Sequence, residues 1–193
     1  MTAGGLLLAA GAGRRMGGPK ALVELGGEPL VRRALRVLEV GGCGPLTVVV
    51  GAEAQRAAAL VGDRARVVVA EDWAEGMGAS LRAGLAAVAD GAQDAVVVHL
   101  VDLPGVTPEA VARLAALGSP SALARAAYAG VPAHPVLLGR THWAAVAAQA
   151  RGDQGARAYL KAHPVTLVEC GDVASPEDVD TPEALAEVNL DTR

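Results

Sequence analysis

The chain has 193 residues, a mass of 19.3 kDa and a formal net charge of −4, and 52% of its residues are hydrophobic. This length suits one domain with a proper core, so we predict a single domain over residues 1–193. Non-specific binding to nucleic acid needs a strongly basic surface, so the negative charge argues against a nucleic-acid partner. No segment reaches about 18 apolar residues without a charge or a glycine, so the sequence predicts no membrane span.

Strand-like and helix-like segments alternate along the whole chain. The predicted strands are Gly5–Ala9, Leu46–Val50, Arg66–Val69, Ala95–Val101, Ala122–Ala127, Pro135–Leu138 and Thr166–Cys170. The predicted helices are Pro29–Val40, Glu53–Val61, Gly78–Ala89, Pro108–Leu117, His142–Ala150, Gly155–Ala162 and Pro182–Val188. Such alternation predicts a three-layer α/β/α fold with a mostly parallel central sheet. Ligands bind beyond the carboxyl ends of strands in such sheets, so we expect the loops after Ala9, Val69 and Val101 to share one rim.

The first predicted strand ends in a glycine-rich turn over residues 11–20. Glycine lets backbone N–H groups approach an anion closely. The turn also carries Arg14, Arg15 and Lys20, which indicates a ligand with several negative charges, such as a nucleoside triphosphate. The spacing of its glycines is one residue too long for the dinucleotide fingerprint, and Ala21 stands where a Walker A loop has Ser or Thr. The alternative interpretation is a surface turn with solvated arginines.

Two acidic positions are candidate ligands of Mg²⁺. Asp102 follows the apolar strand Ala95–Val101 directly, and Mg²⁺ prefers one or two carboxylates together with phosphate oxygens. A turn-capping role is the alternative for Asp102. Asp180 lies just before a capped helix, where it is either a second metal ligand or an acid favoured by the helix dipole. His99 lies inside the strand, and we interpret it as structural.

The segment 72–82 combines glycines, a hydroxyl and the start of a helix. Gly76 and Ser80 are therefore candidates for contacts with a base or a ribose. Trp73 is either a packing residue at the rim or a platform for a ligand.

A further group of polar residues comes later in the chain. His134 and the segment 151–157, with Asp153 and Arg157, are candidates for an acceptor pocket, although His134 also suits a hydrogen-bonded core position. The sequence has no Ser–His–Asp order and no metalloprotease motif, so covalent hydrolytic catalysis has little support.

The two cysteines, Cys43 and Cys170, form neither a C-x-x-C motif nor a zinc-binding spacing. We interpret both as reduced thiols of a cytoplasmic protein. We expect a monomer or a weak homodimer.

Taken together, these segments resemble the MobA-like NTP transferases, and within them the molybdenum cofactor cytidylyltransferase branch. That branch reads L-A-A-G-x-S-x-R-M-G-x-x-K, then E-G-M-x-x-S-L, G-D-M-P, G-H-P-V, G-D-x-G-A-R and D-I-D-T-P-E-D-L. The chain matches this set in order from Leu8 to Leu185. It departs from the pattern at Gly13, where the branch has serine, and at Val101 and Ala133, where the branch has glycine.

The resemblance implies a Rossmann-like nucleotidyltransferase fold and a reaction of an NTP with a phosphorylated acceptor that releases pyrophosphate. It implies catalytic roles for Arg15, Lys20 and Asp102, and Mg²⁺ as the metal of Asp102 and Asp180. The nucleotide contacts that we expect are Ala9, Ala10, Gly11, Gly13, Arg14, Arg15, Gly17, Lys20, Gly76 and Ser80. The acceptor contacts that we expect are His134, Asp153 and Arg157. The Ala-Ala-Gly turn favours CTP over GTP, because the guanylyl branch carries L-A-G-G, and molybdopterin is the leading acceptor.

Two other functions stay open. The branch includes proteins named nicotine blue oxidoreductases, so an NAD(P)H-dependent oxidoreductase is one alternative. Its weakness is the glycine spacing and the lack of a ribose-binding acid at the expected distance, since Glu53 comes much later. A noncatalytic nucleotide-binding protein is the other alternative.

Overall fold

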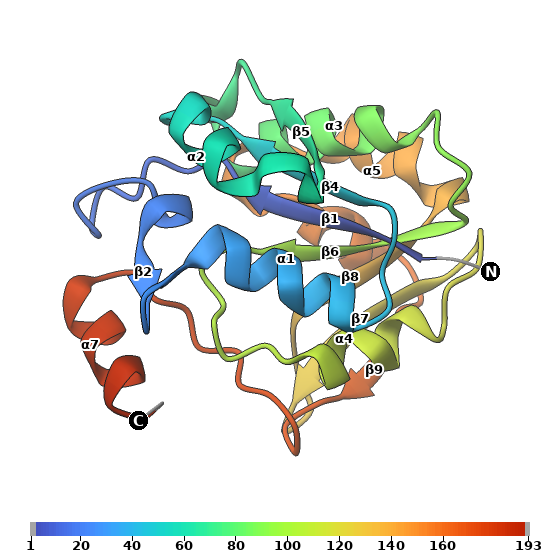
Figure 1. The fold of residues 1–193 in the computed structure, drawn as a ribbon. Helices are drawn as coiled ribbons and strands as arrows, with labels where there is room; N and C mark the ends of the chain where they lie inside the picture. The colour runs from blue at the N-terminus through green and yellow to red at the C-terminus, as the bar shows by residue number, and fades with distance from the viewer. Residues whose placement is uncertain (1–2, 192–193) are drawn as a thin grey trace.

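The computed structural model describes residues 3–191, which form one central seven-stranded sheet with helices around it (Figure 1). The strands lie in the order β5-β4-β1-β6-β8-β7-β9. Their bounds are β1 Ala3–Ala9, β4 Leu46–Val50, β5 Arg66–Val69, β6 Ala95–Leu100, β7 Leu123–Tyr128, β8 Val131–Gly139 and β9 Thr166–Glu169. Strand β8 is antiparallel to β6 and β7, whereas every other neighbouring pair is parallel. The prediction of a mostly parallel sheet is confirmed.

The helices cover both faces of this sheet. Their bounds are α1 Leu30–Val40, α2 Ala54–Val61, α3 Met77–Val88, α4 Pro108–Ala115, α5 Trp143–Gln149, α6 Arg157–Ala162 and α7 Pro182–Asp191. Successive side chains of a strand point to opposite faces. Accordingly, Leu7 of β1 packs with α1, α2 and α4, while Leu6 and Leu8 pack with α3, α5 and α6. Two cores on opposite faces make three layers, so the predicted α/β/α architecture is confirmed.

Short 3-10 helices lie between these elements. Within residues 3–191 they are η1 Lys20–Leu22, η2 Gly62–Arg64, η3 Trp73–Glu75, η4 Arg140–His142 and η5 Gly152–Gln154. None of the helices in this part of the chain combines the length and the hydropathy that a transmembrane span requires.

The central strands are mostly apolar because helices cover them on both sides, and their buried polar residues include Thr47 of β4 and His99 of β6. Every residue of β1 and β4 is buried, as is typical of parallel strands. Cys43 and Cys170 are both unpaired and buried, as expected. Burial raises the pKa of Cys43 to about 12. The thiol of Cys43 therefore behaves as a small apolar group of the core.

A tight hairpin joins β7 and β8, which the sequence pattern did not reveal. Ala129 and Gly130 both adopt positive φ, at 51° and 77°. Two successive left-handed residues match the twist of a two-residue hairpin, so β8 begins directly after them. The predicted strand Pro135–Leu138 is thus only the inner part of β8, whose first residues are more exposed.

A second, smaller hairpin also went unpredicted. Strands β2 Glu24–Leu25 and β3 Glu28–Pro29 pair with each other outside the main sheet. Gly26 and Gly27 form its turn with positive φ values of 59° and 81°. Strands of two residues carry no readable alternation, so the two glycines were its only signal in the sequence.

The end of β8 offers a test of close packing. A Cβ built at Gly139 lies 2.4 Å from the Pro120 carbonyl oxygen and 2.6 Å from the Ala122 backbone nitrogen. Overpacking of this kind costs about 1–3 kcal/mol. We therefore expect Gly139→Ala to lower the free energy of unfolding by that amount in a denaturant titration.

Gly44→Ala is the matched control, because no heavy atom lies within 4 Å of a Cβ built at Gly44. Its free energy of unfolding should stay within about 0.5 kcal/mol of the wild type. Equal losses in the two variants would contradict the packing described at Gly139.

Candidate active site

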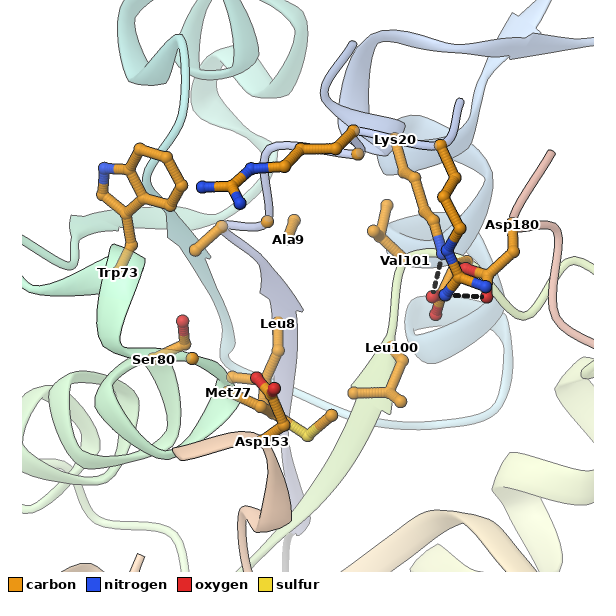
Figure 2. A pocket seen from close by; sticks show the side chains of 17 residues that line it. Leu8, Ala9, Lys20, Trp73, Met77, Ser80, Leu100, Val101, Asp153 and Asp180 are labelled. Atoms are coloured by element: carbon orange, nitrogen blue, oxygen red, sulfur yellow. Dashed lines mark hydrogen bonds and ion pairs between the residues drawn. The ribbon is translucent and has the colours of Figure 1, made fainter. Parts of the chain in front are cut away.

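A cavity of about 410 Å³ opens at the carboxyl ends of β1 and β6 (Figure 2). The loops after β1, β5 and β6 all contribute to its lining, so the expectation that they share one rim is confirmed. All but one of the residues predicted to contact a nucleotide line it: Ala9, Ala10, Gly11, Gly13, Arg14, Arg15, Lys20, Gly76 and Ser80. The exception is Gly17, which takes a φ of 85° in the turn and lies outside the lining.

The loop after β1 folds back on Gly13. The backbone N–H groups of Met16 and Gly18 donate to the Gly13 carbonyl at 2.9 and 3.2 Å. Gly13 has a φ of 57°, and a Cβ built there lies 1.9 Å from the Gly18 carbonyl oxygen. This conformation excludes the serine that the resembling branch carries at this position. The replacement of serine by Gly13 therefore has a steric reason.

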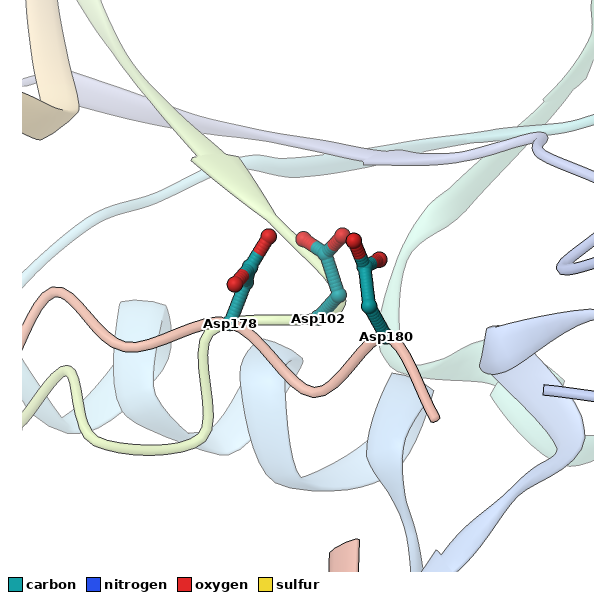
Figure 3. Close-up of side chains that lie close together, drawn as sticks. All are labelled: Asp102, Asp178 and Asp180. Carbon is teal, nitrogen blue, oxygen red and sulfur yellow. The ribbon is translucent and has the colours of Figure 1, made fainter. Parts of the chain in front are cut away.

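Three aspartates converge at the rim of this cavity (Figure 3). Asp102 follows β6, whereas Asp178 and Asp180 precede α7, and one carboxylate oxygen of each lies within 4.8 Å of the others. The backbone N–H of Val179 donates to the Asp102 carbonyl at 2.9 Å and holds the two segments together. Carboxylate oxygens in this number and proximity suit a hard divalent cation. Asp102 and Asp180 are the two ligands predicted from the sequence, and Asp178 is a third carboxylate that was not predicted.

The sequence pattern that could have pointed to Asp178 is Asp178-Val179-Asp180, in which one apolar residue lies between two acids. Val179 is only 1% exposed. Because Val179 is buried and its backbone N–H donates to the Asp102 carbonyl, the aspartates on either side of it are both held close to Asp102.

Lys20 neutralises part of this acidic cluster. Its Nζ donates to Asp102 Oδ2 at 2.7 Å and to Asp180 Oδ1, and Arg15 Nη2 lies 2.5 Å from Asp180 Oδ2. Burial alone would lower the pKa of Lys20, but the hydrogen bonds to Asp102 and Asp180 outweigh it and raise the pKa. The hydrogen bond from Lys20 in turn lowers the pKa of Asp180, and the charge of Arg15 adds to this effect. The lysine thus uses the same carboxylates that a divalent cation would use.

The opposite wall of the cavity comes from η3 and from the first turn of α3. Figure 2 shows Trp73 and Ser80 across the cavity from Lys20 and Asp180. A Cβ built at Gly51 lies 2.5 Å from Trp73 Cγ, so the indole packs directly on this glycine. Trp73 is therefore a packing residue at the rim that also lines the cavity, and its role as a platform for a ligand stays a prediction.

Gly76 brings another segment to the same wall. It has a φ of 112°, and a Cβ built there lies 2.5 Å from Asp153 Oδ1. Only glycine allows η5 to approach α3 this closely. Asp153 thereby reaches the cavity.

A second cavity of about 300 Å³ adjoins the first. The predicted acceptor residues His134, Asp153 and Arg157 all line it, and Asp153 lines both cavities. Burial lowers the pKa of His134 to about 4, so its ring is neutral near pH 7. Arg125 also lines this cavity, and no motif in the sequence pointed to it. His99 lines neither of the two large cavities and is 1% exposed, in agreement with a structural role.

A comparison with models of protein families shows to which family the chain belongs. The family model described as MobA-like NTP transferase domain matches residues 5–167, which include the loop after β1 and Asp102. The chain belongs to this family. Asp178 and Asp180 lie beyond the matched residues.

Individual relatives carry names of different activities. The chain is 40% identical over 192 residues to the nicotine blue oxidoreductase of Paenarthrobacter nicotinovorans, covering 94% of this chain and 93% of the relative. It is 32% identical over 195 residues to the molybdenum cofactor guanylyltransferase of Rhodobacter capsulatus, covering 98% and 91%. A crystal structure of a Mycobacterium tuberculosis protein in complex with manganese matches with a TM-score of 0.81 and 28% identity, over 98% of this chain and 99% of that one. The relatives agree on family and fold and differ in the named reaction.

Removing the Lys20 ammonium is expected to strengthen the binding of a divalent cation to the nucleotide-free protein. In Lys20→Ala, Asp102 and Asp180 lose the cation that competes for their oxygens. We expect the Kd for Mn²⁺ in isothermal titration calorimetry to fall by about tenfold, which corresponds to about 1.4 kcal/mol.

Lys161→Ala is the control, because Lys161 is the only other lysine of the sequence and is exposed on α6. Its Kd for Mn²⁺ should equal that of the wild type. An unchanged or higher Kd in Lys20→Ala would show that lysine and metal do not share these carboxylates.

Proposed function

We propose that the protein is a metal-dependent nucleotidyltransferase that transfers a nucleoside monophosphate from an NTP to a phosphorylated small molecule. The observation that carries this proposal is that a cationic glycine loop meets Asp102 and Asp180 at one cavity, with Asp178 beside them and a second cavity next to the first. In the reaction, an oxygen of the acceptor phosphate attacks the α-phosphorus of the NTP. The bond between that phosphorus and the bridging oxygen breaks, and pyrophosphate leaves with the bonding electrons.

The residues of the loop after β1 would bind the triphosphate and orient it. Backbone N–H groups near Gly11 and Gly13 approach the phosphates closely, and Arg14, Arg15 and Lys20 neutralise them. Phosphoryl-type transfer needs mainly positioning and stabilisation of charge on the phosphate oxygens. Arg15 and Lys20 are the catalytic cations of this proposal, since they lie at the boundary between the loop and the aspartates.

Asp102 and Asp180, with Asp178 as a third donor, fit a Mg²⁺ or Mn²⁺ ion by the chemistry of their oxygens. When bound, such an ion neutralises phosphate oxygens and acts as a Lewis acid. The relative solved with manganese supports a divalent cation in this family.

The second cavity is the proposed acceptor site, with His134, Asp153 and Arg157 as contacts. The name of the Rhodobacter relative supports molybdopterin as the acceptor. We propose CTP as the preferred nucleotide, from the Ala9-Ala10-Gly11 turn, with GTP second. The reaction would take place in the cytoplasm, where NTPs are available, and a monomer or weak homodimer suffices for it.

A second candidate function is an NAD(P)H-dependent oxidoreductase, favoured by the name of the relative with 40% identity. Dinucleotide-binding folds hold the ribose with an acid at the end of their second strand. In this chain Glu53 follows β4 after a short turn, and its carboxylate pairs with Arg56 instead. The aspartate cluster also has no task in hydride transfer.

Thermal unfolding with ligands separates the two functions. We expect CTP with Mg²⁺ to raise the Tm of the wild type by several degrees, because binding to the folded state alone stabilises it. In Asp102→Ala the part of this shift that depends on Mg²⁺ should disappear. Asp63→Ala, at an exposed position outside both cavities, should keep the full shift.

Activity is then measured as pyrophosphate release with each of the four NTPs and a panel of phosphorylated acceptors that includes molybdopterin. A Tm shift with NADPH and none with any NTP would refute the transferase proposal. Binding of an NTP without pyrophosphate release on any acceptor would favour a noncatalytic nucleotide-binding protein.

A further inference from the structure

The second cavity has a cationic end for which the protein supplies no counter-ion. Arg125 comes from β7 and Arg157 from the start of α6, and both line this cavity but not the first one. Arg125 is partly buried, and its burial together with the charge of Arg157 lowers its pKa. The positive charges of Arg125 and Arg157 therefore repel each other, and the partial burial of Arg125 strengthens this repulsion.

Neither guanidinium group has an acidic partner among residues 3–191. None of the ion pairs in this part of the chain includes Arg125 or Arg157, although Asp153 lines the same cavity. Within the described part of the chain, Arg125 donates through Nε alone, to the Ala133 carbonyl at 3.3 Å, so both terminal nitrogens of its fork are left for another acceptor. Arg157 is exposed, whereas Arg125 is partly buried, and an unpaired cation in a partly buried place is costly. An anion from outside would offset this cost and complete the site.

His134 lies at the same end of the cavity. Its Nδ1 is buried and has no hydrogen-bond partner within the described residues. Burial lowers its pKa to about 4, and the charges of Arg125 and Arg157 contribute to the same direction. A bound anion would satisfy the two arginines, and the neutral ring of His134 would add no charge of its own.

Most of the other residues that line the cavity are apolar, and Asp153 and Gln154 add polar groups. Its wall includes Leu8, Leu81, Val98, Leu138 and Leu160, from five different elements. A volume of about 300 Å³ lies at the small end of the range for ligand sites, so it fits one compact ring system.

The two cavities share lining residues from β1 and β6, whereas Arg125 lies on β7, and β8 separates β7 from β6 in the sheet. Leu8, Met77, Leu100 and Asp153 line both cavities. A ligand in the second cavity therefore has one end toward the aspartates and the other toward Arg125.

We infer that the acceptor is a compact ring compound that carries a second anionic group, and that Arg125 and Arg157 bind this group at the end away from the nucleotide. Arg125 is thereby a specificity-determining residue for the acceptor. The inference rests on the proposed function for the orientation of the acceptor, whereas the anion site rests on the second cavity alone. A planar fork of two nitrogens suits a carboxylate or a phosphate.

The test uses 2-naphthyl phosphate as the probe and uncharged 2-naphthol as its matched analogue, with both Kd values measured by calorimetry. We expect the wild type to bind the phosphate at least about tenfold more tightly than the naphthol. Arg125→Ala and Arg157→Ala should each remove most of this preference, and Arg125→Lys should keep only part of it, because an ammonium lacks the fork. Arg64→Ala, at an exposed position outside both cavities, should keep it in full.

The Lys20→Ala variant shows whether the phosphate of the probe binds to the two arginines or to the triphosphate loop. The inference predicts that Lys20→Ala keeps the preference for 2-naphthyl phosphate. It is overturned if the wild type shows no preference, or if Lys20→Ala loses the preference while Arg125→Ala keeps it. Thermal unfolding of Arg125→Lys verifies that the variant is folded.

The Tm shift with CTP and Mg²⁺, measured on the same variants, separates the two proposals. Arg125→Ala should keep that shift. If no NTP shifts the Tm but the naphthyl preference still depends on Arg125 and Arg157, the transferase proposal fails and the anion site stands.

Discussion

The mutual repulsion of three carboxylates is the constraint on which the rest of the site depends. Oxygens of Asp102, Asp178 and Asp180 lie within 4.8 Å of one another, and unit charges at such distances repel strongly unless cations lie between them. In the nucleotide-free protein Lys20 and Arg15 supply those cations. A metal ion bound to a triphosphate brings both a dication for the carboxylates and an anion for the freed lysine and arginine. The exchange would give Asp102, Asp180, Lys20 and Arg15 new partners of opposite charge, which a neutral ligand does not achieve.

The sheet brings these groups together through its topology. Strand β1 lies between β4 and β6, all three are parallel, and the loops after β1 and β6 therefore meet at the same edge. Strand β8 is antiparallel to β6, with Val98 opposite Val136, so its first half, with His134, lies toward that edge as well. The family and the fold are shared with relatives of different named activities, so the specificity of this chain lies in the side chains at this edge.

Much of this arrangement follows from local sequence. The apolar runs of the central strands predicted a covered parallel sheet, and Gly13 and Asp102 stood where such sheets bind ligands. Other features depend on contacts between distant segments. Lys20 meets carboxylates that lie 82 and 160 residues away, so its ion pairs had no local signal. Arg125 belongs to no motif and becomes notable only because α6 places Arg157 beside the same cavity.

The most direct test of the central claim is a crystal structure with Mn²⁺ and a CTP analogue whose bond between the α- and β-phosphates cannot be cleaved. The account predicts the metal on Asp102 and Asp180, and Lys20 Nζ moved from these carboxylates to a phosphate oxygen. A nucleotide bound while Lys20 still bridges Asp102 and Asp180, with no metal on either, would contradict it.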